Sequence, residues 1–573
     1  MKKTASTIVD NIEAHSLKWM GIATVVMVCY LMVGAVCGLD VCDNGFYMTF
    51  YDNIFQSPRS VEYNFMYYLS GVTGGALLRL FPAMGLLGMR VAGIIAIMAA
   101  MWVAFLLLRH IVPSAAIILA MLVITCAFID IPVTLGNDIL ATLLWVIASA
   151  ALYKAMERDS GWLMLLAGAV IGINIFSRLP NVLGLGLLVL MPVAGKATAG
   201  RQAMSWGRVW AMALLGFLGA VLGAGAVVAM MHALGHLDIF LDNMADLHAL
   251  AADGKTGSTH SLAYMVVAQL DFYKGVLWVA VKYGIVAWIY IKVGDWCTWK
   301  PVRWLLRTTC LVALVWLTMR LNIVRPVWAM AFLGCFYVIV MGNQQQRMAA
   351  WLGLYMILVF PMGSDGYAHN QGTLLDILAL PLAASLWIRN HGRDLLVAFA
   401  LVCAFKMVTG AIYFDEGPVW QKTATVHNPR VAGILTTPQR AAVLNHMLAG
   451  IKPWVGAGDT LMVYGSAPII NYMTATRPDL GCSWPELLSP ALLQHKLATA
   501  SHGPLPIVLR QKFNTIGQQW GPPTTDLAHY NVKSPFLDDA KLHSLNTFLH
   551  NNHYRVAYSD PYFILYLPPA QHR

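Results

Sequence analysis

Charged residues are scarce in this sequence: Asp, Glu, Lys and Arg make up only 12% of its 573 residues, whereas hydrophobic residues make up 58%. This composition excludes an ordinary soluble globular protein and predicts a polytopic membrane protein. The formal net charge of +10 is spread between the apolar segments, as topology signals usually are. We therefore expect no nucleic-acid partner.

Two other patterns are missing. No cysteine pair has the CxxC spacing of a zinc or dithiol redox centre. Of the 9 cysteines, Cys42 and Cys482 lie clearly outside the apolar runs; apolar filler is their expected role, with a disulfide between them as the alternative. No internal repeat is present, which argues against the repeat-built transporter folds.

Long apolar runs dominate what is present. A window of about twenty residues predicts about thirteen membrane spans, near 19–38, 85–108, 112–129, 137–153, 161–177, 180–195, 209–231, 275–293, 307–322, 326–342, 348–362, 372–388 and 395–413. The first span has no cleavage site after it and is expected to be retained. Lys and Arg collect in alternate short loops, which predicts a cytoplasmic N-terminus and places everything after Phe414 outside.

This arrangement predicts a membrane domain over 1–414, with long outer loops at 39–84 and 232–274. The first loop repeats apolar residues at helical spacing, which predicts a helix lying on the membrane with one aromatic face, formed by Phe46, Tyr47, Phe50, Tyr51, Ile54 and Phe55. The second loop is polar and predicts a mobile segment over a site.

Residues 415–573 have the composition of a small α/β domain outside the membrane. Strands are predicted at Thr460–Tyr464, Pro506–Leu509, Arg555–Tyr558 and Phe563–Leu567, and helices at Pro438–Gly450 and Asp538–Asn551.

Carboxylates at the predicted outer face are the first candidates for chemistry. Asp40 and Asp43 directly follow the first span, where a carboxylate near hydrocarbon is costly and suggests a functional site. Either could take a proton from an acceptor hydroxyl; the alternative is that Asp43 or Asn44 caps a helix beginning near Phe46. At the next outer turn, Asp130 and Asp138 could hold a cation or position an acceptor, although Asp138 also suits the start of a helix.

Cations in the outer half of the predicted spans break the positive-inside pattern. Several fixed positive charges suit a lipid-linked phosphate or pyrophosphate, and the residues concerned are Arg178, Lys282, Arg320, Arg325 and Lys406. Arg178 has almost no loop in which to reach the surface, whereas Lys282 and Lys406 could snorkel. A glycine-rich outer turn at 361–372 could bind phosphate and sugar through its amides, Asp365, His369 and Asn370, or be a plain turn.

Four features together resemble the membrane-embedded GT-C glycosyltransferases. They are the order of about thirteen spans, the first outer loop opening with Asp43-Asn44-Gly45-Phe46-Tyr47, the acidic turn ending Asn137-Asp138, and an outer C-terminal α/β domain. Within that superfamily the chain is most similar to bacterial aminoarabinose and protein mannosyl transferases, which use polyprenyl-phosphate sugars. The resemblance implies that Asp43 is the catalytic base, Asp138 a supporting acid and Arg178 a ligand of the donor phosphate. Two family patterns are missing: the Trp-Trp-Asp motif of oligosaccharyltransferases, and an Asp-Glu pair, since Asn44 follows Asp43.

The sequence therefore predicts a glycosyltransferase in the bacterial inner membrane that moves a sugar from a polyprenyl-phosphate donor to a hydroxyl, with inversion. The acceptor is a lipid-linked saccharide, lipopolysaccharide or protein, and a divalent metal is left open. The alternatives are a transporter or flippase for a lipid-linked saccharide, or en bloc transfer of the oligosaccharyltransferase type. The substrate contacts are assigned to Asp40, Asp130, Asn137, Arg178, Lys282, Arg320, Arg325, Asp365, His369 and Asn370.

Overall fold

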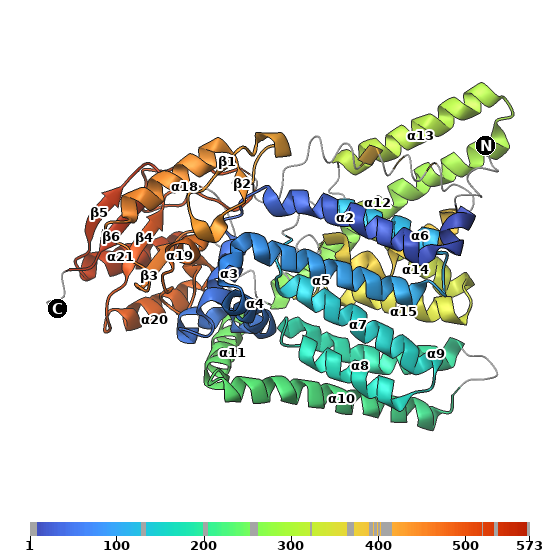
Figure 1. Ribbon diagram of the computed structural model, residues 1–573, viewed down its shortest axis with the longest axis horizontal. Coiled ribbons are helices and arrows are strands. Elements are labelled where there is room, and N and C mark those ends of the chain that lie inside the picture. The colour runs from blue at the N-terminus through green and yellow to red at the C-terminus, as the bar shows by residue number, and fades with distance from the viewer. Residues whose placement is uncertain are drawn as a thin grey trace.

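Helices form most of the protein, and a small sheet region lies at one end of the helix bundle (Figure 1). The computed structural model describes residues 9–127, 133–198, 204–252, 262–320, 324–363, 372–388, 415–517, 519–531 and 537–569, together with 394, 398, 401 and 402. We call 415–569 the C-terminal region. Although the C-terminal region is the last part of the chain, it packs directly against the first helices.

The helical part runs from α2 to η6. Its elements are α2 (Ser16–Val36), α3 (Asp43–Asn53), η1 (Pro58–Tyr67), α4 (Tyr68–Leu80), η2 (Pro82–Met84), α5 (Gly85–Leu108), α6 (Ser114–Ala127), α7 (Asn137–Glu157), α8 (Gly161–Asn174), η4 (Leu179–Gly186), α9 (Leu187–Thr198), α10 (Trp206–Ala233), α11 (Leu237–Ala252), α12 (Leu262–Trp296), α13 (Lys300–Arg320), α14 (Val324–Met341), α15 (Gln344–Val359) and η6 (Gly372–Ile377).

Among the described residues, 7 helical stretches are long and apolar enough to cross a membrane. They are Ser16–Val36, Pro82–Leu108, Asn137–Glu157, Leu179–Ala197, Trp206–Ala233, Val266–Val293 and Val324–Met341. The predicted spans near 112–129 and 161–177 are shorter apolar helices, and the one near 395–413 lies almost wholly outside the described residues. The chain is a multi-pass membrane protein, while the number of thirteen spans stays a prediction.

The predicted helix of the first outer loop exists, but the expectation that it lies on the membrane is wrong. Phe46, Phe50, Tyr51 and Ile54 are at most 6% exposed. α3 packs against α4 and against α19 (Ile469–Thr474) of the C-terminal region. The aromatic residues therefore face protein instead of lipid: Phe50 and Tyr51 lie against α4, and Phe46 lies against Trp484 of the C-terminal region.

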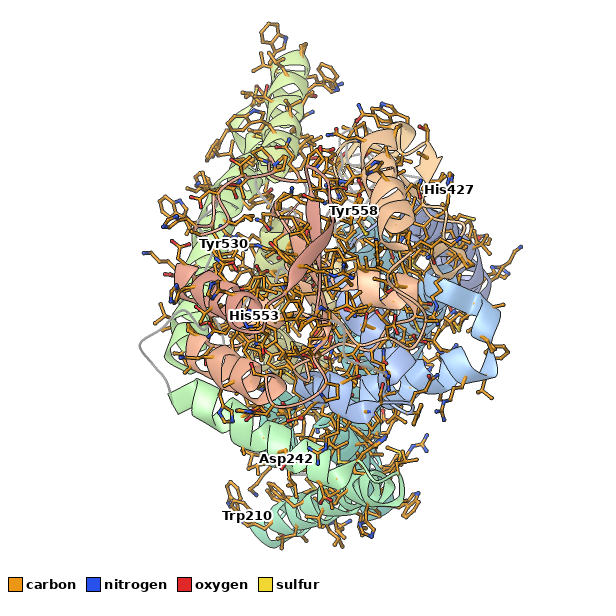
Figure 2. The ribbon with its side chains drawn as sticks, turned by 90° about the vertical axis from the view of Figure 1, so that its left-hand side faces the viewer. Trp210, Asp242, His427, Tyr530, His553 and Tyr558 are labelled. Atoms are coloured by element: carbon orange, nitrogen blue, oxygen red, sulfur yellow. The ribbon has the colours of Figure 1, made fainter. Side chains whose placement is uncertain are left out.

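The second outer loop is helical where the structure describes it. Residues 253–261, which include the polar stretch on which the prediction of a mobile segment rests, lie outside the described residues, so that segment stays a prediction. α10 continues to Ala233, α11 follows it, and α12 begins at Leu262. Ion pairs hold α11: Asp242 lies 2.6 Å from Arg59, and Asp246 lies 3.2 Å from Lys496 of the C-terminal region. Figure 2 shows Asp242 on this helix, below the C-terminal region.

The C-terminal region contains all four predicted strands. β3 (Leu461–Tyr464), β4 (Ile507–Gln511), β5 (Arg555–Ser559) and β6 (Phe563–Leu567) form one sheet in the order β3-β4-β6-β5. β3 and β4 are parallel, and the other pairs are antiparallel. A separate hairpin pairs β1 (Ala424–Thr425) with β2 (Leu435–Thr436). The remaining helices are α18 (Pro438–Ile451), α19, α20 (Pro490–Ala500) and α21 (Asp539–Asn551).

A buried carboxylate joins the C-terminal region to the end of the first span. Asp415 is 0% exposed and accepts hydrogen bonds from the Leu39 amide at 2.9 Å and the Thr436 hydroxyl at 2.7 Å. Lys422 and Arg440 lie 3.6 and 3.4 Å from its other oxygen. Because a buried charge is costly unless it is paired, these contacts make Asp415 a fixed attachment point.

The disulfide considered between Cys42 and Cys482 is not formed. Both are buried free thiols. The Cys42 thiol donates to the Ser466 carbonyl at 2.9 Å, and the Cys482 thiol donates to the Trp484 carbonyl at 3.2 Å. Both cysteines therefore pack as buried side chains, Cys42 at the contact between the start of α3 and the C-terminal region, and Cys482 within the C-terminal region.

Close packing of α8 against α10 can be tested at two glycines of α10. A Cβ at Gly223 would lie 2.1 Å from the Ala169 carbonyl oxygen, whereas a Cβ at Gly225 would meet nothing within 4 Å. We expect Gly223→Ala to destabilise the protein by ~1–3 kcal/mol, because the backbones must separate. Gly225→Ala should be neutral or slightly stabilising, since alanine favours the helix. Thermal unfolding of both variants in the same detergent checks this, and equal midpoints would contradict it.

Candidate functional site

The start of α3 is held by Asp40. This residue is 1% exposed and accepts hydrogen bonds from the Cys42 amide at 2.8 Å, and from the amide and side chain of Asn44 at 2.7 Å each. Burial raises the pKa of Asp40, and these hydrogen bonds oppose that rise. The helix begins at Asp43, not near Phe46, and neither Asp43 nor Asn44 is its N-cap. Asp40 instead satisfies the first amides of α3.

Arg90, from α5, locks the same region from the membrane side. It is 3% exposed and donates to the carbonyl oxygens of Ala35 at 2.9 Å and Gly38 at 2.8 Å. The Asn44 side-chain oxygen accepts from Arg90 at 3.4 Å and also from the Thr134 hydroxyl. The sequence offered a signal for this residue, a charge inside the predicted span 85–108, but its partners could not be read from the sequence.

Asp43 and Tyr47 occupy one face of α3, four residues apart. Asp43 is half-buried, and the Tyr47 hydroxyl donates to the Asn137 side-chain oxygen at 2.6 Å. Burial raises the pKa of Tyr47 well above its usual value, and Tyr67, Asp138 and Asp43 raise it further. Tyr47 therefore stays a neutral hydrogen-bond donor. From the sequence, Tyr47 was predicted only as part of the aromatic face of this helix.

Asp138 lies in the first turn of α7, where a helix N-terminus stabilises a carboxylate. It is 30% exposed and lies 3.6 Å from Nε of Arg178, which is 4% exposed. Arg178 also donates to the carbonyl oxygens of Phe360 at 3.0 Å and Met362 at 3.3 Å. The guanidinium thus joins the end of α15 to the start of α7 and keeps Asp138 in place.

The structure brings Asp43, Asn137, Asp138 and Arg178 to the end of the bundle that meets the C-terminal region (Figure 1). No described contact connects Lys282 or Arg325 to this group. Lys282 lies over the ring of Trp278 on its own helix, 5.4 Å from the centroid. Arg325, in the first turn of α14, lies against Gly275 of α12.

Several predicted residues cannot be placed. Arg320 ends α13, but its side chain is not among those described. Asp130, Asp365, His369, Asn370 and Lys406 lie outside the described residues.

The arrangement presents two partly exposed carboxylates beside a neutral phenol. The hydrogen bond from Tyr47 to Asn137 brings the first turn of α3, which contains Asp43, close to the first turn of α7, which contains Asp138. In the described part of the chain, no group of three or more His, Cys, Asp and Glu side chains is arranged to hold a metal ion. The two carboxylates can accept protons or position hydroxyl groups.

No protein-family profile matches the sequence, and no curated protein matches it. Among solved structures the chain is similar to the crystal structure of ArnT from Cupriavidus metallidurans bound to undecaprenyl phosphate. The identity is 13% and the TM-score 0.40, over 96% of this chain and 98% of that chain. Membership of a family stays a prediction, and the function proposed for this chain rests on its own contacts.

The role of Asp40 can be tested with Asp40→Asn. The NH2 of asparagine replaces one carboxylate oxygen and cannot accept, so at least one of the donors at Cys42 and Asn44 loses its partner. We expect a loss of about 1–3 kcal/mol in unfolding free energy, measured by thermal unfolding in detergent. Asp10→Asn, at an exposed position before α2 and outside the membrane-crossing stretches, is the matched control and should match the wild type. An unchanged midpoint for Asp40→Asn would show that its hydrogen bonds do not hold α3.

Proposed function

We propose that this protein is a GT-C-type glycosyltransferase, which moves a sugar from a polyprenyl-phosphate donor to a hydroxyl group of an acceptor. The observation that carries the proposal is the hydrogen bond from Tyr47 to Asn137, which joins the start of α3, with Asp43, to the start of α7, with Asp138, at the end of a membrane helix bundle. A lipid-linked donor would reach such a position from the bilayer, while a polar acceptor would approach from the side of the C-terminal region.

Asp43 is the proposed base. Its carboxylate removes the proton of the acceptor hydroxyl while the hydroxyl oxygen attacks the anomeric carbon of the donor sugar. The bond from that carbon to the phosphate oxygen breaks, and its electron pair leaves with polyprenyl phosphate. A single displacement of this kind inverts the anomeric centre. Asp138 is proposed to orient the acceptor, and Tyr47 donates hydrogen bonds without changing its charge.

The leaving phosphate gains negative charge, which fixed cations stabilise without transferring a proton. Arg178 is the proposed ligand of the donor phosphate, at the start of α7 where Asp138 lies. Arg325 is the second proposed ligand: its Nε is buried and has no hydrogen-bond partner among the described residues. Lys282 and Arg320 are proposed only to attract the anionic donor.

The membrane is proposed to be the bacterial inner membrane, with the C-terminal region outside the cytoplasm. A lipid-linked saccharide, lipopolysaccharide or protein is the proposed acceptor. Asp43 and Asp138 would be the carboxylates that contact a divalent metal if the reaction uses one.

The proposal predicts that Asp43→Asn lowers sugar transfer by a factor of about 10²–10⁴, because the base is lost while the shape is kept. The measurement is release of polyprenyl phosphate by purified protein given a panel of polyprenyl-phosphate sugars and acceptors. Asp52→Asn is the control on the same helix. Asp52 forms an ion pair with Arg430 at 2.6 Å, so its loss should cost at most about 1 kcal/mol of stability and leave transfer unchanged.

Wild-type activity that persists in Asp43→Asn would overturn the assignment of the base. If the wild type releases no polyprenyl phosphate but accumulates a lipid-linked saccharide across sealed vesicles, the protein is a transporter instead.

A further inference from the structure

The C-terminal region is joined to the ends of two membrane-crossing stretches. A Cβ at Gly85, the first residue of α5, would lie 2.7 Å from the Arg430 carbonyl oxygen. A few residues further on, the Leu435 carbonyl accepts a hydrogen bond from the Gly38 amide, directly after α2, at 2.7 Å. The short segment 430–435 therefore runs from the start of α5 to the end of α2, and these two ends lie close together beside the C-terminal region (Figure 1).

α2 has one stripe of exposed apolar side chains. Ile22, Val25 and Val26 are 44, 63 and 54% exposed, and Cys29 is exposed as well. These positions recur at helical spacing, and Val36, two turns after Cys29, continues the same stripe to the end of the helix. Because α2 is long and apolar enough to cross the membrane, this stripe faces lipid.

The C-terminal region extends this stripe beyond the end of α2 through η7 (Val419–Gln421). Val419 and Val36 both pack against Cys37. The next residue, Trp420, is 59% exposed. The lipid-facing stripe of α2 therefore continues from Val36 through Val419 to an exposed tryptophan of the C-terminal region.

A buried ammonium group fixes the loop that carries Trp420. Lys422 is 2% exposed, and its ammonium donates to the carbonyl oxygens of Glu416 at 2.7 Å and Gly417 at 3.1 Å. The same ammonium lies 3.6 Å from the carboxylate of Asp415, which is bonded to the chain after α2. Because these contacts close the loop on both sides of Trp420, the backbone of this tryptophan is held at the end of α2.

A second exposed apolar corner lies at the start of α5. Leu80 and Phe81 are 71 and 59% exposed, and they directly precede the membrane-crossing stretch Pro82–Leu108. Arg79, in the last turn of α4, lies over the Phe55 ring, 4.5 Å from its centroid, and places a cation beside them. Exposed apolar residues next to a basic side chain at the end of a span suit the headgroup region of a membrane, where lipid phosphates lie.

Membrane lipid is the partner that fits both places. Each exposed group continues a surface that already faces lipid, α2 for Trp420 and α5 for Phe81. Tryptophan is enriched where a membrane meets water, because its ring is apolar and its N–H group is polar.

Another exposed tryptophan of the C-terminal region lies away from the spans. Trp454, which is 43% exposed, follows α18. A Cβ at Gly450, near the end of α18, would lie 2.1 Å from the Tyr558 ring of β5. β5 lies at the end of the molecule opposite the helix bundle (Figure 1), and Tyr558 is on the side that faces the viewer in Figure 2. Trp454 is therefore a matched control for Trp420.

We propose that the C-terminal region rests on the membrane surface, with Trp420 inserted among lipid headgroups at the end of α2 and with Leu80 and Phe81 inserted at the start of α5. This contact does not depend on sugar transfer. It takes the place of the membrane contact that the sequence predicted for the aromatic face of α3. Because Trp420 and Asp415 belong to one fixed loop, lipid would steady the attachment of the C-terminal region.

Photo-crosslinking on the full chain measures this contact, in nanodiscs of phosphatidylethanolamine and phosphatidylglycerol. The photoreactive residue p-benzoylphenylalanine is introduced in place of Trp420, Phe81 or Trp454, one position at a time, and mass spectrometry identifies what each position captures on illumination. We expect phospholipid adducts at positions 420 and 81 and none at position 454. No donor or acceptor sugar is present, so the result is independent of the proposed transferase activity.

Three outcomes would each overturn the proposed surface. They are absence of a phospholipid adduct at position 420 or at position 81, capture of a second protein chain there in place of lipid, and equal capture of lipid at position 454.

Two serine variants give a second readout if the photoreactive residue disturbs folding. Trp420→Ser and Trp454→Ser each remove one exposed indole, but only Trp420→Ser removes a proposed lipid contact. We expect Trp420→Ser to lower the thermal unfolding midpoint in nanodiscs by more than Trp454→Ser does, because apolar area that lipid had covered is lost. Equal midpoints for the two variants would overturn the contact at Trp420.

Discussion

Two buried carboxylates at the end of the first span control the rest of the structure. Asp40 and Asp415 are each at most 1% exposed, and a buried charge is tolerated only with partners. Asp40 accepts a hydrogen bond from Asn44 of α3, and the charge of Arg90 from α5 stabilises its carboxylate. Asp415 accepts hydrogen bonds from Leu39 and Thr436 and forms ion pairs with Lys422 and Arg440. Because Asp40 and Leu39 are neighbours in the chain, the start of α3 and the attachment of the C-terminal region are set together.

This shared attachment gives the candidate site its rigidity. α3 is held at its start by Asp40 and along its length by α4 and α19, so Asp43 and Tyr47 have fixed backbones. Asp138 receives a similar support from Arg178, which is anchored by two carbonyl oxygens of the chain after α15. Groups positioned in advance lose little entropy when a substrate binds, which is the condition that transfer between two bound substrates requires.

The C-terminal region also contacts the start of α3 directly. Its residues 466–469 meet α3 at Cys42, Val41 and Thr49. Together with the attachment at Asp415, these contacts hold the C-terminal region at two neighbouring places.

By itself, the sequence determined the membrane class, most of the apolar helices, the four C-terminal strands and the candidacy of Asp43, Asp138 and Arg178, because hydrophobic periodicity and the alternation of spans are local properties. Tertiary structure alone decided the rest. It buried the aromatic face of α3 and placed α11 where it forms ion pairs. It also made Asp40 the acceptor for the first amides of α3 and placed the carbonyl oxygens that Arg90 contacts. These outcomes depend on residues far apart in the chain, such as Leu39 and Asp415, which are separated by 376 positions. No local pattern reports which distant group will satisfy a buried charge, so the sequence could nominate the acids but not assign their partners.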